Sequence, residues 1–229
     1  MTGPQAQAAP GEGSSALAYR EREAGGKPSG LLVLHHGRGS NEGDLMALAA
    51  VLDPERRLHV VSPRAPIELP GSPGYHWYLV PRAGHPDPET FGEACSVLGT
   101  FHDELWRRTG IEPARTVLGG FSMGAAMSYA VGLGAGRPLP AGILALSGFL
   151  PTMTGWRPDL AGRAGLPVLI AHGARDSVLP VALAREAERA LREGGLPVEY
   201  HESESAHHVD PRQLHTFRAW VDARLPSSA

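Results

Sequence analysis

The sequence has one cysteine, no long hydrophobic run and no excess of charge of one sign. Its 229 residues carry a formal net charge of −3, and the basic residues are scattered, so nothing favours nucleic acid as a partner. Cys95 has no partner for an internal disulfide, which agrees with a reducing compartment. Because it lies in a helical apolar pattern, we interpret Cys95 as a core residue rather than as a reactive thiol.

No apolar run approaches the roughly 20 residues that are needed to cross a bilayer. The N-terminus also has neither the basic start nor the apolar core of a secretory signal, so we expect a cytoplasmic location and no membrane span. Residues 1–15 are rich in Gly, Ala, Pro and Gln without periodicity, which predicts a disordered tail. Residues 16–229 are long enough to form one domain with a large apolar core.

Apolar runs and amphipathic stretches alternate along most of the chain. The continuous apolar run 31–34 is typical of a strand covered on both faces. Asn41, Asp87 and Asp210 are candidate N-caps for three of the helices, and 17–23 is a candidate edge strand. We predict strands near 31–34, 59–62, 115–121, 141–147, 168–172 and 198–201, helices near 41–52, 87–110, 123–133, 180–194 and 210–225, and a loop at 63–88. This alternation predicts an α/β protein with a mostly parallel central sheet, helices on both faces and little or no cap domain.

The segment Gly120-Phe121-Ser122-Met123-Gly124 fits the pattern Gly-x-Ser-x-Gly. In α/β hydrolases this pattern turns a strand abruptly into a helix and presents a nucleophilic Ser at the apex. The segment follows a predicted buried strand and precedes a helical run, which is the setting that the chemistry requires. A structural turn whose Ser only caps a helix is the alternative.

A Ser hydroxyl needs a base within hydrogen-bond reach and a carboxylate that orients the base. Asp176 follows the strand predicted at 168–172, as an acid of this fold should, although a surface Asp paired with Arg175 or capping a helix is an alternative. The base must come from the loop that holds His207 and His208. We favour His207, because the small Ala206 before it permits a close approach to Ser122, and we keep His208 as the alternative.

Acyl transfer also needs hydrogen-bond donors for the developing oxyanion. In this fold one comes from the residue after the nucleophile, here Met123, and the other from a loop after an early strand, here Arg38 between Gly37 and Gly39. A tight turn with no catalytic part is the alternative for that loop. A metal site is not expected, because adjacent His pairs on extended segments point in opposite directions and no His-x-x-x-His motif occurs.

Six segments together resemble the phospholipase/carboxylesterase family, which includes bacterial carboxylesterases and acyl-protein thioesterases. These segments are Leu34 to Gly39, Ser62 to Pro66, Gly74 to Tyr78, Gly119 to Ala125, His172 to Pro180 and Ala206 to Val209. They occur in the family's order and spacing, and the resemblance covers about Leu31 to Leu225. By similarity, Ser122, Asp176 and His207 fall on the triad positions, and the amides of Arg38 and Met123 on those of the oxyanion hole.

The chain departs from the family's pattern at two places. Many members carry Gln where this chain has Met123, which leaves the amide donor intact. The Pro-rich segment 63–88, which helps to shape the acyl pocket in the family, is individual here. Trp77 and Leu179 are candidates for lining that pocket, and a buried core position is an equally good interpretation of Trp77.

The residues and the resemblance together predict a serine esterase that acts without a cofactor on small-molecule carboxylic esters of short to medium acyl chain. A thioesterase or lysophospholipase is the alternative among enzymes. A catalytically silent α/β hydrolase that binds a ligand is the alternative from another class. Members of the family often dimerise, so the resemblance allows a homodimer.

Overall fold

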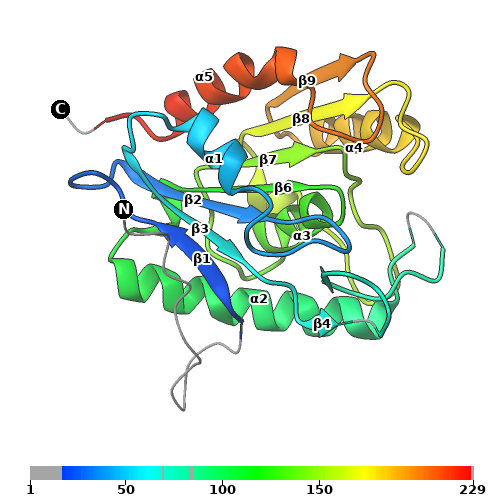
Figure 1. Ribbon diagram of the computed structural model, residues 1–229. Helices are drawn as coiled ribbons and strands as arrows, with labels where there is room; N and C mark the ends of the chain where they lie inside the picture. Colours follow the sequence, from blue (N-terminus) through cyan, green and yellow to red (C-terminus); the bar gives the residue numbers. More distant parts are fainter. Residues whose placement is uncertain (1–16, 69, 83–84, 228–229) are drawn as a thin grey trace.

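The chain folds around a seven-stranded sheet with the strand order β1-β3-β2-β6-β7-β8-β9 (Figure 1). The computed structural model describes residues 17–68, 70–82 and 85–227, so the tail predicted at 1–15 lies outside the described residues. The strands are β1 Tyr19–Arg22, β2 Gly30–His35, β3 Leu58–Pro63, β6 Thr116–Phe121, β7 Gly142–Leu146, β8 Val168–Gly173 and β9 Val198–Ser203. Strand β1 pairs antiparallel with β3, and the other pairings are parallel.

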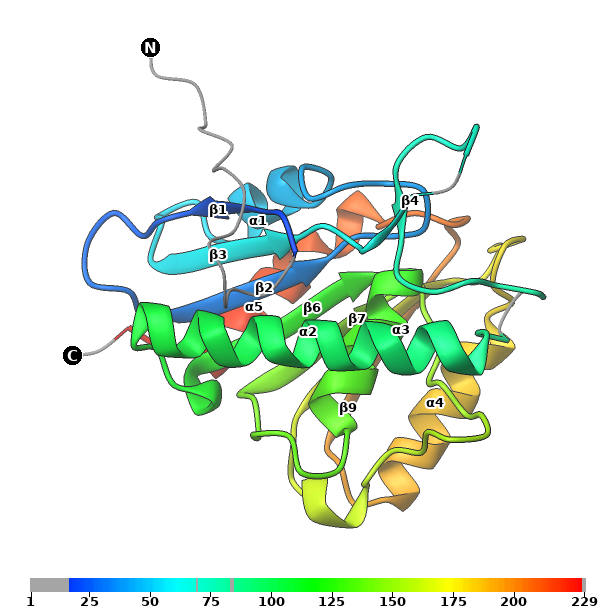
Figure 2. The same cartoon turned by 90° about the horizontal axis from the view of Figure 1, so that it is seen from below.

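Five α-helices of the described residues cover the two faces of this sheet. They are α1 Met46–Leu52, α2 Pro88–Thr109, α3 Met123–Leu133, α4 Ala182–Glu193 and α5 Leu214–Arg224, with short 3-10 helices at Pro113–Arg115, Ala161–Arg163 and Pro211–Gln213. Helices α1 and α5 contact each other on one face. Helices α2, α3 and α4 lie on the other, which Figure 2 shows from below. The predicted class, a mostly parallel sheet between helical layers, is confirmed.

Strand β2 shows why the sequence has continuous apolar runs. Leu31 and Val33 pack with α2 and α3, whereas Leu32 and Leu34 pack with α1 and α5. All four side chains are fully buried. Because both faces of a parallel strand are covered by helices, polar residues have no solvated face to occupy.

The caps of α2 agree with the sequence prediction. The Asp87 carboxylate accepts a hydrogen bond of 2.9 Å from the Thr90 amide, and Pro88 occupies the first turn. Gly110 ends the helix with φ = 66°, a left-handed conformation that glycine adopts without strain. Cys95 in this helix is partly buried against the core, and burial raises the pKa of its thiol to about 12.

Three local predictions were wrong in detail. The first helix begins at Met46 rather than after Asn41, because the Asn41 side chain accepts the Gly43 amide at 2.8 Å and holds a turn there. The loop predicted at 63–88 contains a two-stranded antiparallel sheet, β4 Ile67–Glu68 and β5 Tyr75–His76. The last helix starts as a 3-10 turn, which the Asp210 carboxylate caps at the Arg212 amide.

Asp53 joins the edge strand β1 to the start of β3. Its side chain is fully buried and accepts hydrogen bonds from Arg22 Nη2 at 2.5 Å, the Arg57 amide at 2.8 Å and the Leu58 amide at 3.0 Å. Removing one partner of a buried ion pair leaves the other charge without compensation, which is strongly destabilising.

Within the described residues, no helix has both the length and the apolarity to span a membrane.

We therefore expect Asp53→Asn to lower the free energy of unfolding by about 3 kcal/mol, measured by urea denaturation. Glu55→Gln is the matched control, since the Glu55 pair with Arg218 has side chains 52% and 38% exposed and should contribute far less to the free energy of unfolding. Equal losses for the two variants would contradict this assignment.

Candidate active site

Ser122 lies at the sharp turn between β6 and α3. Its backbone has φ = 55° and ψ = −119°, a strained conformation that directs the side chain out from the carboxyl edge of the sheet. The turn is possible because the residues two positions before and two positions after Ser122 are glycines. A Cβ on Gly120 would lie 2.3 Å from the Gly124 carbonyl oxygen, and one on Gly124 would lie 1.9 Å from the His35 carbonyl oxygen. The pattern Gly-x-Ser-x-Gly is therefore a steric requirement of this turn.

Asp176 follows β8 and has a fully buried side chain. One carboxylate oxygen accepts the amides of Val178 at 2.9 Å and Leu179 at 2.8 Å, and the other lies 2.6 Å from His207 Nδ1. Burial raises the pKa of this carboxyl. The Leu179 amide, the His207 imidazole and the Val178 amide together outweigh burial and leave the pKa below its usual value. Asp176 is thus an anion with both oxygens fixed.

The imidazole of His207 bridges Asp176 and Ser122. Its Nδ1 faces the carboxylate, so this nitrogen carries the proton, and its Nε2 lies 2.9 Å from Ser122 Oγ, which can donate to it. The Phe121 ring packs against the imidazole with centroids 5.0 Å apart. His208, the alternative base, is exposed, and no hydrogen bond joins it to Ser122 or Asp176. The structure thus brings together the three predicted residues and places His208 outside this chain of hydrogen bonds.

The loop that carries Arg38 is held rigidly from several sides. His36 Nε2 accepts the Ala65 amide at 3.0 Å, so Nδ1 carries the proton and donates to the Gly37 carbonyl at 2.7 Å. The Gly39 amide donates to the Tyr75 carbonyl at 3.0 Å, and Gly39 has φ = 74°. Among the described residues, the Arg38 amide has no hydrogen-bond partner. Met123 begins α3, where the first amides of a helix have no acceptor within it. Both amides are therefore available to an oxyanion.

Trp77 lies in the core and is not part of the pocket wall. Its side chain is fully buried, and its indole Nε1–H donates to the His36 carbonyl at 2.9 Å. Its backbone amide donates to Met123 Sδ at 3.3 Å. Trp77 thus joins the loop before Arg38 to the first residue of α3, and of its two interpretations from the sequence the structure shows the buried one.

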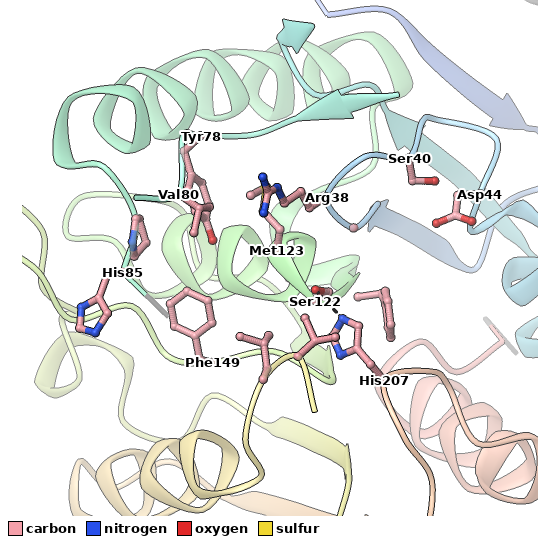
Figure 3. Close-up of a pocket in the computed structure, with 15 residues that line it drawn as sticks. Arg38, Ser40, Asp44, Tyr78, Val80, His85, Ser122, Met123, Phe149 and His207 are labelled. Carbon is pink, nitrogen blue, oxygen red and sulfur yellow. Dashed lines mark hydrogen bonds between the residues drawn. The ribbon is translucent and has the colours of Figure 1, made fainter. Parts of the chain in front are cut away.

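A cavity of about 310 Å³ opens beside Ser122 (Figure 3). Leu179, the other predicted pocket residue, lines it. The aromatic and aliphatic residues of the wall also include three that the sequence did not single out, namely Tyr78, Val80 and Phe149. Phe149 follows β7 of the main sheet, and Tyr78 and Val80 follow β5 in the segment 63–88, which the family resemblance had linked to the acyl pocket. No cluster of three or more His, Cys, Asp or Glu with metal-binding geometry occurs in the described part of the chain.

A family model described as Phospholipase/Carboxylesterase matches residues 22–224, which is most of the chain. The chain belongs to the phospholipase/carboxylesterase family. The match includes every residue of the site described above, and the family's activity is that of an esterase-type hydrolase.

Relatives and solved structures agree with this membership. This chain is similar to lysophospholipase-like protein 1 of Mus musculus, with 29% identity over 215 residues that cover 88% of this chain and 89% of the relative. The crystal structure of esterase PE8 is 33% identical with a TM-score of 0.81, covering 91% of this chain and 99% of that one. The Bacillus cereus carboxylesterase structure is 25% identical with a TM-score of 0.78, covering 91% and 94%. The fold is that of an α/β hydrolase, and no cap domain is evident in the described residues.

His172 is a further residue of the site, and the sequence patterns did not single it out. It lies in β8, four residues before Asp176, and its side chain is fully buried. His172 Nε2 lies 2.9 Å from the Leu179 carbonyl oxygen and 3.3 Å from Asp176 Oδ2. Since both neighbours are acceptors, Nε2 carries the proton and donates to them. His172 thus holds the turn that fixes Asp176, and its spacing to Asp176 at a strand end was the available signal.

We expect His172→Leu to lower kcat for an ester about tenfold, because the loss of a hydrogen bond to a charged group loosens Asp176. His172→Gln retains an N–H at similar reach and should recover part of the lost kcat. Steady-state kinetics, with thermal melting as a check on folding, measures both effects. A kcat for His172→Leu equal to that of the wild type would refute this role.

Proposed function

We propose that this protein is a serine carboxylesterase that hydrolyses carboxylic esters through an acyl-enzyme. The observation that supports the proposal is the unbroken chain of hydrogen bonds from Asp176 through His207 to Ser122, at the mouth of the cavity. An imidazole that is held in one tautomer by a buried carboxylate can accept the proton of a Ser hydroxyl.

The reaction would proceed in two halves. Ser122 Oγ attacks the ester carbonyl while His207 Nε2 takes its proton, and the amides of Arg38 and Met123 donate to the oxyanion. His207 then returns the proton to the alcohol oxygen as the ester bond breaks, which leaves an acyl group on Ser122. Water, deprotonated by the same imidazole, releases the acid and restores the serine.

The size of the cavity supports acyl chains of short to medium length. At about 310 Å³ it lies at the lower end of the usual range for ligand pockets, which extends from roughly 300 to 1,000 Å³. Tyr78, Val80 and Phe149 give its wall an apolar character that suits a hydrocarbon chain.

Ser122→Ala should lower kcat/KM for p-nitrophenyl butyrate by at least about a thousandfold, because the removal of one triad member disables the whole unit. Ser177→Ala is the matched control, since Ser177 is exposed, adjoins Asp176 and does not line the cavity. Release of p-nitrophenol measures both. Residual activity near that of the wild type in Ser122→Ala would remove Ser122 as the nucleophile.

A series of p-nitrophenyl esters from acetate to palmitate tests the substrate class. We expect kcat/KM to peak between butyrate and octanoate, as the limited cavity requires. The name of the mouse relative makes a lysophospholipase-type enzyme the second candidate, and a peak at palmitate would favour that candidate or a long-chain thioesterase.

A further inference from the structure

The cavity beside Ser122 has two differently composed sides. Figure 3 shows Ser40 and Asp44 on one side of Ser122, and Tyr78, Val80 and Phe149 on the other. The chain's topology agrees with this view. Ser40 and Asp44 lie between β2 and α1, and α1 packs with α5 on one face of the sheet, whereas Tyr78 and Val80 precede α2 on the opposite face.

The position of His207 decides which part of an ester lies on which side. The imidazole that takes the proton of Ser122 must later give a proton to the departing alcohol, so the alcohol has to lie on the imidazole's side of the reacting carbon. His207 comes from the segment that leads into α5, which is the face where α1 also lies. The alcohol is therefore directed toward Ser40 and Asp44, and the acyl chain toward Tyr78 and Val80.

The carboxylate of Asp44 makes no ion pair within the described residues. Asp44 is exposed, and neither its carboxylate nor the Ser40 hydroxyl makes a side-chain hydrogen bond or ion pair within the described residues. The neighbouring Glu42 differs, because its carboxylate is held by Arg64 through two hydrogen bonds of 2.7 Å. The carboxylate of Asp44 is thus free for a ligand.

Two cations lie near this side of the cavity, Arg38 in its lining and Arg20 against Gly43, and neither forms an ion pair with Asp44 within the described residues. The Arg38 guanidinium acts on His76 in β5, whose pKa is lowered by burial and by this charge. The charge of Arg20 contributes to the lowered pKa of Glu42. Burial lowers the pKa of His36, and the hydrogen bond to the Gly37 carbonyl and the carboxylates of Asp44 and Glu42 partly oppose that effect.

We propose that the preferred substrates are esters whose alcohol carries a positively charged nitrogen, which the Asp44 carboxylate attracts while the acyl group occupies the apolar side. This inference rests on the proposed esterase function, because the orientation of the ester follows from the role of His207.

The test compares two esters of equal shape, butyrylcholine and its uncharged isostere 3,3-dimethylbutyl butyrate. At low ionic strength the wild type should show a kcat/KM about threefold higher for butyrylcholine, the size expected of a partly exposed charge pair. This ratio should fall toward one in Asp44→Asn. Both kcat/KM values are measured on the same preparation of each variant, so the fraction of active enzyme cancels from their ratio.

Two controls separate a local effect from a general one. Glu193→Gln changes the net charge equally, at the end of α4 remote from the cavity, and should keep the wild-type ratio. Added NaCl at about 0.5 M should lower the ratio in the wild type without any mutation, since salt screens exposed charges.

A ratio near one in the wild type, or a ratio that Asp44→Asn leaves unchanged, would overturn the inference while hydrolysis of p-nitrophenyl butyrate upholds the esterase function. A wild type that hydrolyses none of the three esters would overturn both.

Discussion

The site depends on one constraint, the strained backbone of Ser122 at the carboxyl end of β6. The conformation at φ = 55° directs the hydroxyl away from the sheet, and it exists only because Gly120 and Gly124 leave room for the neighbouring backbone. The central position of β6 and the helices on both faces fix that point in space. Asp176 and His207, at the ends of β8 and β9, are brought to it by the same sheet edge.

A second layer of contacts keeps this arrangement rigid. His36, Trp77 and Tyr75 hold the loop of Arg38, and His172 holds the turn of Asp176. Beneath Ser122, Ser128 donates to the Gly124 carbonyl at 3.0 Å and therefore accepts from His35 Nδ1 at 2.8 Å. Burial keeps His35 uncharged by lowering its pKa. The polar groups of the Arg38 loop and of Asp176 are thus fixed before a substrate arrives, which is the condition for electrostatic stabilisation.

Local patterns predicted much of the fold and the central residues, and tertiary packing decided the rest. Ser122 and Asp176 could be found because each follows an apolar strand, and the caps of α2 because Asp87 and Gly110 act on their own helix. The choice between His207 and His208 required the direction of a ring, which packing sets. The late start of α1 follows from a side-chain hydrogen bond of Asn41 that competes with the helix. Of the cavity wall only Leu179 was predicted as a lining residue, since the other wall residues come from loops that meet only in the folded chain.

The claim on which everything else rests is that His207 and Asp176 activate Ser122. Labelling with a fluorophosphonate, followed by peptide mass spectrometry, tests it most directly. We predict a single phosphonyl adduct on Ser122 in the wild type, and labelling at least about a hundredfold slower in His207→Ala with the fold intact. An adduct on another residue, or labelling of Ser122 at the wild-type rate without the imidazole, would contradict the account.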